Sequence, residues 1–256
     1  PAPAVTSPPR VVLDERLDAV GAGAVVALPP DAAHHVRRVL RLGPGEAVEL
    51  CDGAGRTAVG RLAGADVMLT SDPVAVPRPA PALALVQAVA RGRRADDAVR
   101  TACELGVDLI VPVVADRTQG RPDATARDAL RGRWRAVAGA ALAQSRGAWM
   151  AEVAPIRTVA ELANVPPWDG LRLVAVPGAE PLPDVLARRA GGAATEASVG
   201  VAVGPEGGWT TEEVAVLETA GWTAVGLGPT VLRTEHAGPA ALAVLAAAAG
   251  RWAADR

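Results

Sequence analysis

The stretch VGPEGGWTTEEV, residues 203–214, joins an apolar run to a segment with a helical pattern. Its middle holds a proline, an acid and three glycines, and glycine lets a ligand approach the backbone closely. Thr210 and Glu213 form a T-x-x-E capping box, which predicts that a helix begins at this point. Ligands of open α/β sheets bind beyond the carboxyl ends of the strands. The junction is therefore a candidate binding loop, with a tight turn that needs glycine for steric reasons as the alternative.

The pattern on either side of this loop predicts a parallel α/β fold. From Ala82 onward, apolar runs of strand length alternate with longer helical segments. Such alternation is typical of a parallel sheet covered by helices on both faces. The expected strands cover residues 82–90, 108–115, 171–176, 197–204 and 223–228, and the expected helices cover residues 94–105, 124–145, 183–190, 210–220 and 235–249.

The first part of the chain has a different pattern. Short strand-type segments separated by turn residues predict a small β-rich barrel or sandwich. Asp31 is expected to cap one short helix, which a Gly-Pro-Gly sequence ends. The four prolines of PVAVPRPAP, residues 73–81, predict a linker. We therefore expect two domains, residues 1–76 and residues 77–256.

Composition and charge restrict the function only loosely. The 256 residues are half apolar, and a net charge of −2 does not by itself point to nucleic acid. All 26 basic residues are arginine, and residues 81–150 carry 11 of them against 7 acids. This local excess fits either a phosphate-facing surface or a solvated helical face.

Cysteine usage and hydropathy bear on the compartment. Cys51 and Cys103 make neither a disulfide framework nor a zinc site, so we expect no metal and a reducing, cytoplasmic setting. The sequence shows no signal-peptide pattern and no strictly apolar run of about 18 residues. We therefore expect neither export nor a membrane partner.

Three loops that carry glycine and proline follow predicted strands, at residues 176–181, 204–208 and 227–235. The phosphate-binding pattern G-x-x-x-x-G-K-[ST] is absent, and no G-x-G-x-x-G follows the first strand of the α/β region. These loops better suit a ligand that is read by backbone groups. We expect its adenine to lie in an apolar slot beside Leu227 and Leu232.

The segment LRTEHAG, residues 232–238, places charged residues at the start of the last predicted helix. Helix capping and the helix dipole alone explain Thr234 as an N-cap and Glu235 in the first turn. They do not explain Arg233, because a cation near a helix N-terminus is disfavoured. We therefore expect Arg233 to have a functional role.

Segments along nearly the whole chain resemble one known family. They are HHVRRVLRLGPGEAVELCDGAG (34–55), CELGVDLIVPVVADRTQGR (103–121), RWRAVAGAALAQS (133–145), VGPEGGWTTEEV (203–214) and LGPTVLRTEHAGPAAL (227–242). In this order and spacing they resemble the RsmE family of ribosomal RNA methyltransferases, which belong to the SPOUT superfamily and use S-adenosylmethionine (SAM). The first segment resembles the PUA-like domain of that family.

The resemblance implies both a fold and a reaction. The implied fold is an α/β, SPOUT-type parallel sheet with a deep C-terminal trefoil knot, preceded by a small β-rich PUA-like domain. The implied reaction is methylation of N3 of a uridine in small-subunit (16S) ribosomal RNA, free or in the assembled subunit, by a homodimer. The residues implied to bind SAM are Val176, Pro177, Val203, Gly204, Pro205, Glu206, Gly207, Gly208, Leu227, Gly228, Leu232, Arg233 and Thr234.

The implied chemistry assigns roles to three charged or titratable residues. Uracil N3 carries a proton at neutral pH, so catalysis requires alignment and help with that proton or with the charge it leaves. Arg233 is the candidate for holding a phosphate or a uracil carbonyl oxygen as charge develops. Glu235 is the candidate proton acceptor. His236 is either an alternative base or a solvated or packed side chain.

The candidates for RNA contact are mainly arginines, because the forked guanidinium suits phosphate. The set comprises Arg10, Arg37, Arg38, Arg117, Arg121, Arg133, Gln144, Ser145 and Arg146. Arg41 would extend a helical stripe begun by Arg37 and Arg38. Gln144 and Ser145 would either read a base edge or face a neighbouring helix. His34 and His35 are interpreted as structural.

The sequence departs from the family pattern at His236, at Ala143, at Thr118 and at the pair Gly238-Pro239. These departures leave open a SPOUT methyltransferase with a different RNA target. A second alternative is a non-catalytic RNA-binding relative, although such a protein would not need three intact cofactor loops. A third is a Rossmann-type reductase, against which the missing G-x-G-x-x-G counts.

Overall fold

The computed structural model describes residues 7–90, 93–189 and 192–252. It divides into two compact units. The N-terminal unit comprises the chain up to Arg78 together with Leu142–Met150, and the C-terminal unit comprises Pro79–Ala141 and the chain from Ala151 onward. The segment Leu142–Met150 is the difference from the expected division, which placed it in the second domain.

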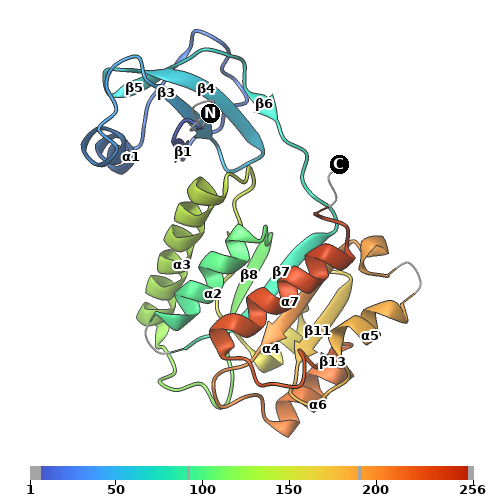
Figure 1. The fold of residues 1–256 in the computed structure, drawn as a ribbon. Coiled ribbons are helices and arrows are strands. Elements are labelled where there is room, and N and C mark those ends of the chain that lie inside the picture. The colour runs from blue at the N-terminus through green and yellow to red at the C-terminus, as the bar shows by residue number, and fades with distance from the viewer. Residues whose placement is uncertain (1–6, 91–92, 190–191, 253–256) are drawn as a thin grey trace. The chain divides into compact units, whose positions relative to one another are not determined.

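The N-terminal unit is β-rich, as its sequence pattern predicts (Figure 1). Its strands are β1 (Arg10–Val12), β2 (Val25–Val26), β3 (Ala47–Cys51), β4 (Arg56–Ala63), β5 (Asp66–Leu69) and β6 (Val74–Ala75). They form one sheet in the order β1-β3-β4-β5-β2, with β6 paired to β4. Val36, Val48, Leu50 and Val67 are fully buried in its core. Strand β6 lies in the predicted linker, so part of that segment completes the sheet.

The helix of this unit differs from the expected one. It consists of α1 (Pro30–His34) and a π-helical turn, η1 (His35–Val39). Asp31 lies inside the first turn and makes no side-chain cap, because proline at the first helical position already sets the backbone for the helix. Arg41 follows the helix with a φ of 56°, so it does not extend a helical stripe with Arg37 and Arg38.

Hydrogen bonds to Arg10 and to Gly53 explain why Leu142–Met150 belongs to the N-terminal unit. The guanidinium of Arg10 donates to the carbonyl of Gly147 at 2.5 Å and pairs with the carboxylate of Glu49 at 2.6 Å. The backbone N–H of Met150 donates to the carbonyl of Gly53 at 2.8 Å. No sequence pattern within residues 142–150 predicts these long-range hydrogen bonds.

The C-terminal unit contains the predicted parallel sheet. Its strands are β7 (Ala82–Ala88), β8 (Leu109–Val114), β9 (Glu152–Val153), β10 (Arg157–Thr158), β11 (Leu171–Ala175), β12 (Ser198–Val203) and β13 (Thr223–Val225). The order is β10-β8-β7-β12-β11-β13, with β9 paired to β8, and every pair is parallel. The sequence pattern did not indicate β9 and β10, because a strand of two residues shows no periodicity.

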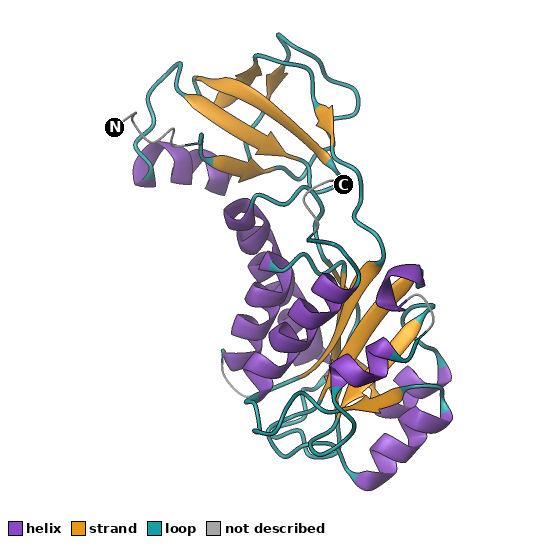
Figure 2. Ribbon diagram, turned by 45° about the vertical axis from the view of Figure 1, so that its right-hand side comes forward, coloured by secondary structure: helices purple, strands orange, loops and turns teal. Residues whose placement is uncertain are grey.

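Helices cover both faces of this sheet, as predicted (Figure 2). They are α2 (Arg94–Glu104), α3 (Ala124–Ser145), α4 (Val159–Asn164), α5 (Leu182–Ala187), the 3₁₀ turn η2 (Gly192–Thr195), α6 (Thr211–Thr219) and α7 (Thr234–Ala248). On one face, Gly238 of α7 lets the helix approach the side chain of Leu85. On the other, Leu162 of α4 and Leu217 of α6 pack in one cluster with Val86.

The capping box at the start of α6 is confirmed. The hydroxyl of Thr210 accepts from the backbone N–H of Glu213 at 3.1 Å, and the Glu213 carboxylate accepts from the backbone N–H of Thr210 at 2.8 Å.

No helix in the described part of the chain is long and apolar enough to cross a bilayer.

A buried ion pair fixes the end of α7 to the sheet, and its removal should be costly. Arg251 and Asp108 are each 6% exposed and lie 2.6 Å apart, and the same guanidinium donates to the carbonyls of Pro81 and Gly106. Arg251→Ala removes the cation beside the buried carboxylate of Asp108, which keeps the backbone N–H of Leu83 as a donor, so we expect a loss of about 3 kcal/mol in the free energy of unfolding. Urea denaturation measures this loss.

The matched control is Arg188→Ala. Arg188 pairs with Glu180 at the surface, where the two side chains are 62% and 40% exposed. An exposed pair contributes less than about 1 kcal/mol. Equal denaturation midpoints for the two variants would contradict the role assigned to Arg251.

Candidate functional site

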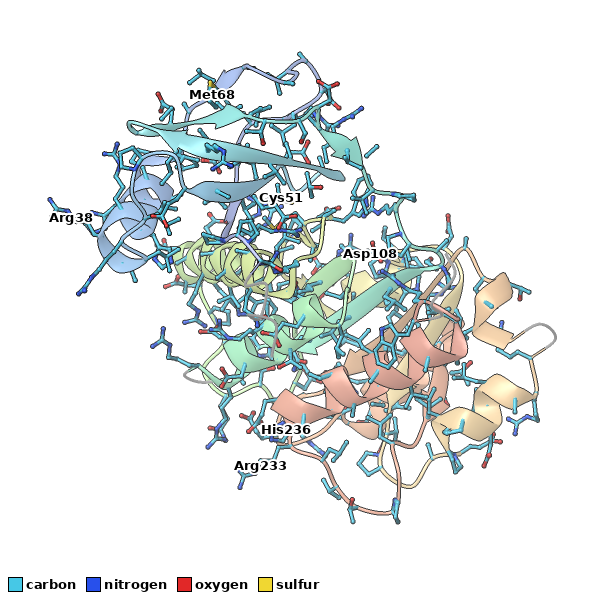
Figure 3. All side chains as sticks on the ribbon, turned by 45° about the horizontal axis from the view of Figure 1, so that its top comes forward. Arg38, Cys51, Met68, Asp108, Arg233 and His236 are labelled. Carbon is cyan, nitrogen blue, oxygen red and sulfur yellow. The ribbon has the colours of Figure 1, made fainter. Side chains whose placement is uncertain are left out.

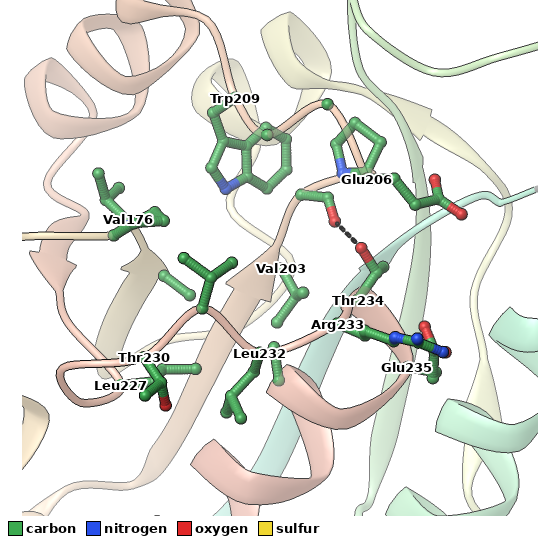
Figure 4. Close-up of a pocket in the computed structure, with 18 of the residues that line it drawn as sticks. Val176, Val203, Glu206, Trp209, Leu227, Thr230, Leu232, Arg233, Thr234 and Glu235 are labelled. Atoms are coloured by element: carbon green, nitrogen blue, oxygen red, sulfur yellow. Dashed lines mark hydrogen bonds between the residues drawn. The ribbon is translucent and has the colours of Figure 1, made fainter.

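A cavity of about 640 Å³ lies at the carboxyl ends of β11, β12 and β13 (Figure 4). Every residue that the resemblance implies for SAM binding lines it: Val176, Pro177, Val203, Gly204, Pro205, Glu206, Gly207, Gly208, Leu227, Gly228, Leu232, Arg233 and Thr234. Glu235 lines it as well. The sequence missed other lining residues, among them Arg94, Trp209 and Val231. The structure thus brings three separate loops to one hollow.

The cavity has an apolar end and a charged end. Val176, Leu227 and Leu232 lie on one side of it, and Glu206 and Arg233 lie on the other (Figure 4). A volume of several hundred cubic ångströms with mostly apolar walls and a few polar groups is typical of a small-molecule site. The apolar end can take a flat heterocycle, and the charged end can take polar or ionic groups.

The glycines of the loop after β12 are required by close approach. A Cβ on Gly204 would lie 3.1 Å from the ring of Trp209, and a Cβ on Gly207 would lie 3.1 Å from Cβ of Arg117. Gly208 has a φ of +70°, which favours glycine. The steric alternative from the sequence is therefore correct in part, and the same small residues leave the backbone open to the cavity.

The sequence predicted Thr234 as the N-cap of α7. In the structure Thr234 is instead the first residue of that helix. Arg233 occupies the N-cap position through its backbone, without a side-chain cap. The hydroxyl of buried Thr234 instead donates to the carbonyl of Gly204 at 3.3 Å (Figure 4). This bond ties the start of α7 to the loop after β12.

The loop after β8 braces the loop after β12. Nη1 of Arg117 donates to the carbonyl oxygens of Gly207 at 2.9 Å and of Trp209 at 3.2 Å. The backbone N–H of Asp116 donates to the buried carboxylate of Glu213 at 2.8 Å. The structure thus gives Arg117 a bracing contact that its predicted role at an RNA phosphate did not include.

The loops after β11 and β13 are joined by their backbones. The N–H of Val176 donates to the carbonyl of Val225 at 2.9 Å, and the N–H of Gly226 donates to the carbonyl of Glu180 at 2.7 Å. The N–H of Leu182 in turn donates to the carbonyl of Gly226 at 2.9 Å. These bonds fix the apolar end of the cavity.

Comparison with known proteins identifies the family. Residues 77–246 match the family described as RNA methyltransferase domain, and residues 28–66 match the RNA methyltransferase PUA domain. The ribosomal RNA small subunit methyltransferase E of Mycobacterium bovis is 34% identical over 239 residues, which are 90% of this chain and 89% of the relative. The chain belongs to the RsmE family of RNA methyltransferases. Its N-terminal unit is the PUA domain of that family.

Solved structures of similar proteins contain the cofactor. A methyltransferase of Legionella pneumophila solved with SAM has a TM-score of 0.83 at 26% identity, covering 94% of this chain and 98% of that one. A ribosomal RNA small subunit methyltransferase E of Neisseria gonorrhoeae, bound to SAM, has a TM-score of 0.80 at 28% identity, with the same two coverages.

The residues predicted to bind RNA differ in how exposed their side chains are and in which contacts they already make. In the PUA domain, Arg37 and Arg38 are exposed, and Arg38 points away from its helix (Figure 3). The side chain of Arg10 is 7% exposed and is held by Glu49 and Gly147. Its guanidinium is therefore not free to meet a phosphate. Arg146 pairs with Glu49 at 3.0 Å and donates to the carbonyl of Pro8 at 2.8 Å, but its side chain stays 41% exposed.

The remaining predicted residues lie on α3 and on the loop before it. Arg133 pairs with Asp96 at 3.0 Å but stays 44% exposed, and Arg121 is 61% exposed beside Asp116. Gln144 is exposed, whereas Ser145 is half-buried. Arg121 and Arg133 in the C-terminal unit, and Gln144 in the N-terminal unit, therefore each remain candidates for RNA contact.

The histidines and cysteines are separate from the cavity. His34 and His35 are exposed, so their interpretation as structural residues is wrong. His236 is exposed near Arg233 but does not line the cavity (Figure 3). Burial raises the pKa of the Cys103 thiol to about 12, which rules out a reactive thiolate there. Among the described residues, no three His, Cys, Asp or Glu side chains are grouped to hold a metal ion.

Proposed function

We propose that this chain transfers the methyl group of SAM to N3 of a uridine in small-subunit (16S) ribosomal RNA. The observation that carries the proposal is the single cavity lined by all the residues implied to bind SAM. The SAM-bound relatives, at TM-scores of 0.83 and 0.80, support it. So does the name of the Mycobacterium bovis relative, a small subunit ribosomal RNA methyltransferase.

The residues present fit the cofactor. The apolar side chains of Val176, Leu227 and Leu232 suit an adenine, and backbone groups of the glycine-rich loop are open to the ligand. Gly228 has a φ of +120°, and nothing lies within 4 Å of where its Cβ would be, so its backbone faces open space. When bound, SAM supplies an already activated methyl group.

The chain's own residues then have two tasks. Arg233, at the charged end, offsets the negative charge that develops on a uracil carbonyl oxygen. The carboxylate of Glu235, which also lines the cavity, accepts the proton that leaves uracil N3. His236 is the weaker candidate for this proton because its side chain does not reach the cavity wall.

Three further properties implied by the family belong to this proposal. We propose a homodimer, supported by apolar side chains at the surface near the cavity: Val231 is 82% exposed and Val244 is 38% exposed. We propose the trefoil knot because the family implies it, and the backbone bonds that join residues 176–182 to residues 225–226 show that two of the loops it would involve are neighbours. We propose a cytoplasmic location, where ribosomal RNA is made.

Mapping of methylated bases tests the reaction. In small-subunit RNA from cells that lack this protein, we expect the loss of one N3-methyluridine, restored by the wild-type gene. An unchanged small-subunit profile together with a lost modification in another RNA would establish a different RNA target. Calorimetry without SAM binding would favour the non-catalytic relative.

The brace made by Arg117 gives a prediction for cofactor affinity. Arg117→Ala removes two hydrogen bonds to the loop after β12, each worth about 1 kcal/mol. Their combined loss of about 2 kcal/mol should raise the Kd for SAM about 30-fold, as measured by calorimetry. The matched control is Arg121→Ala, since Arg121 contacts Asp116 and not the loop. Equal Kd values for the two variants would show that the hydrogen bonds of Arg117 do not contribute to SAM binding.

A further inference from the structure

Arg94 lies at the charged end of the cavity, where no pattern in the sequence predicts it. It is the first residue of α2, which follows β7. In the sheet, β7 lies directly beside β12, so the chain that leaves β7 comes next to the glycine-rich loop. Arg94 lines the cavity, and its Nη1 lies 3.8 Å from Oε1 of Glu206.

The pair of Arg94 and Glu206 is loose. A separation of 3.8 Å is longer than a hydrogen bond, and the two side chains are 61% and 38% exposed. Exposed ion pairs of this kind contribute little to stability. An incoming anion can therefore take the guanidinium of Arg94 at small cost.

The surroundings of Arg94 favour an anion that arrives from solvent over one enclosed in the cavity. Glu206 and Glu235 both line the cavity, so an anion enclosed there lies beside two carboxylates, whereas an anion at the 61% exposed side chain of Arg94 is screened from them by solvent. Exposed Arg121, after β8, and exposed Arg233, after β13, lie at the same carboxyl edge of the sheet as Arg94. Exposed arginines that follow three strands at one edge of the sheet suit a phosphate backbone, because the guanidinium fork matches phosphate geometry.

We propose that Arg94 binds a backbone phosphate of the RNA beside the target nucleotide, and that Glu206 holds its guanidinium at the cavity rim until RNA arrives. This proposal rests on the proposed function and adds a residue to its substrate contacts. Arg94 acts as a positioning residue: it fixes where the strand lies relative to the cavity and takes no part in the methyl transfer. A phosphate contact of this kind positions the RNA without reading its sequence.

The test uses the full-length protein and small ribosomal subunits purified from cells that lack it. For Arg94→Ala we expect KM for subunits to rise about 10-fold, kcat to stay within about 2-fold, and the calorimetric Kd for SAM to be unchanged. The slope of the logarithm of subunit affinity against the logarithm of salt concentration should become shallower by about 1. Arg94→Lys, which keeps the charge without the fork, should recover part of the affinity.

Arg93→Ala is the matched control because it removes the same charge one residue away. Arg93 is exposed, contributes only its backbone to the start of α2 and does not line the cavity. We expect its KM and salt slope to match the wild type. An equal loss in both variants would overturn the proposal, because it would show a general charge effect.

Two further outcomes separate this proposal from the function on which it rests. A raised Kd for SAM in Arg94→Ala, with an unchanged salt slope, would overturn it and assign Arg94 to the cofactor. If the wild-type protein methylates neither small subunits nor free small-subunit RNA, the proposed function fails, and the salt slope of binding still decides the role of Arg94.

Discussion

Arg233→Ala should lower kcat for methylation about 100-fold while the protein stays folded. Arg233 lines the charged end of the cavity, and its side chain is exposed. Among the described residues it has neither an ion-pair partner nor a capping role for its guanidinium. Its charge is therefore available to the reacting uracil, where the negative charge grows as N3 loses its proton. A group that acts on developing charge changes kcat more than it changes ground-state binding.

Single-turnover methylation of small subunits, with SAM saturating, measures this effect. The unfolding temperature should not change, because no described contact of the side chain is lost. Arg189→Ala removes an exposed arginine that pairs with Glu196 at 2.8 Å and does not line the cavity, so its rate should match the wild type. A methylation rate for Arg233→Ala within about 3-fold of the wild-type rate would show that Arg233 has no catalytic role.

Much of the cavity could be predicted because it is built from loops that follow strands. Once the alternation of strands and helices indicates a parallel sheet, the carboxyl ends of the strands share one edge. The loops at residues 204–208 and 227–235 were therefore expected at that edge, and the family resemblance assigned both of them to one cofactor site. The position of Arg94 in the cavity could not be predicted in this way, because it depends on β7 being the neighbour of β12. The order of strands in a sheet cannot be read from periodicity.

The roles of individual arginines were harder to predict for a different physical reason. A guanidinium can pair with a phosphate, with a carboxylate or with a backbone carbonyl. Arg10 meets Glu49, and Arg117 meets the carbonyls of Gly207 and Trp209, and both partners are distant in sequence. Because the chain contains arginine and no lysine, residue type does not distinguish the structural basic side chains from the RNA-binding ones. Only the fold separates them.

Gly226→Ala is expected to weaken SAM binding at least 100-fold, more than any other single methyl group added near the cavity. A Cβ at this position would lie 2.4 Å from the carbonyl oxygen of Ala179 and 3.6 Å from that of Glu180. Both contacts are backbone atoms, so no side chain can rotate away. The loops after β11 and β13 must separate, which breaks the bonds of Gly226 to Glu180 and Leu182. The apolar wall that includes Leu227 then moves.

Calorimetry with SAM and thermal unfolding measure the two consequences of this change. We expect a Kd raised at least 100-fold, which corresponds to about 2.7 kcal/mol, and a loss of about 3 kcal/mol in stability from overpacking. Gly132→Ala adds the same methyl group in α3, where nothing lies within 4 Å of the new Cβ. Since alanine is the better helix former, this control should bind SAM normally and unfold at a slightly higher temperature. Unchanged SAM affinity in Gly226→Ala would mean that the contact between the two loops does not shape the cavity.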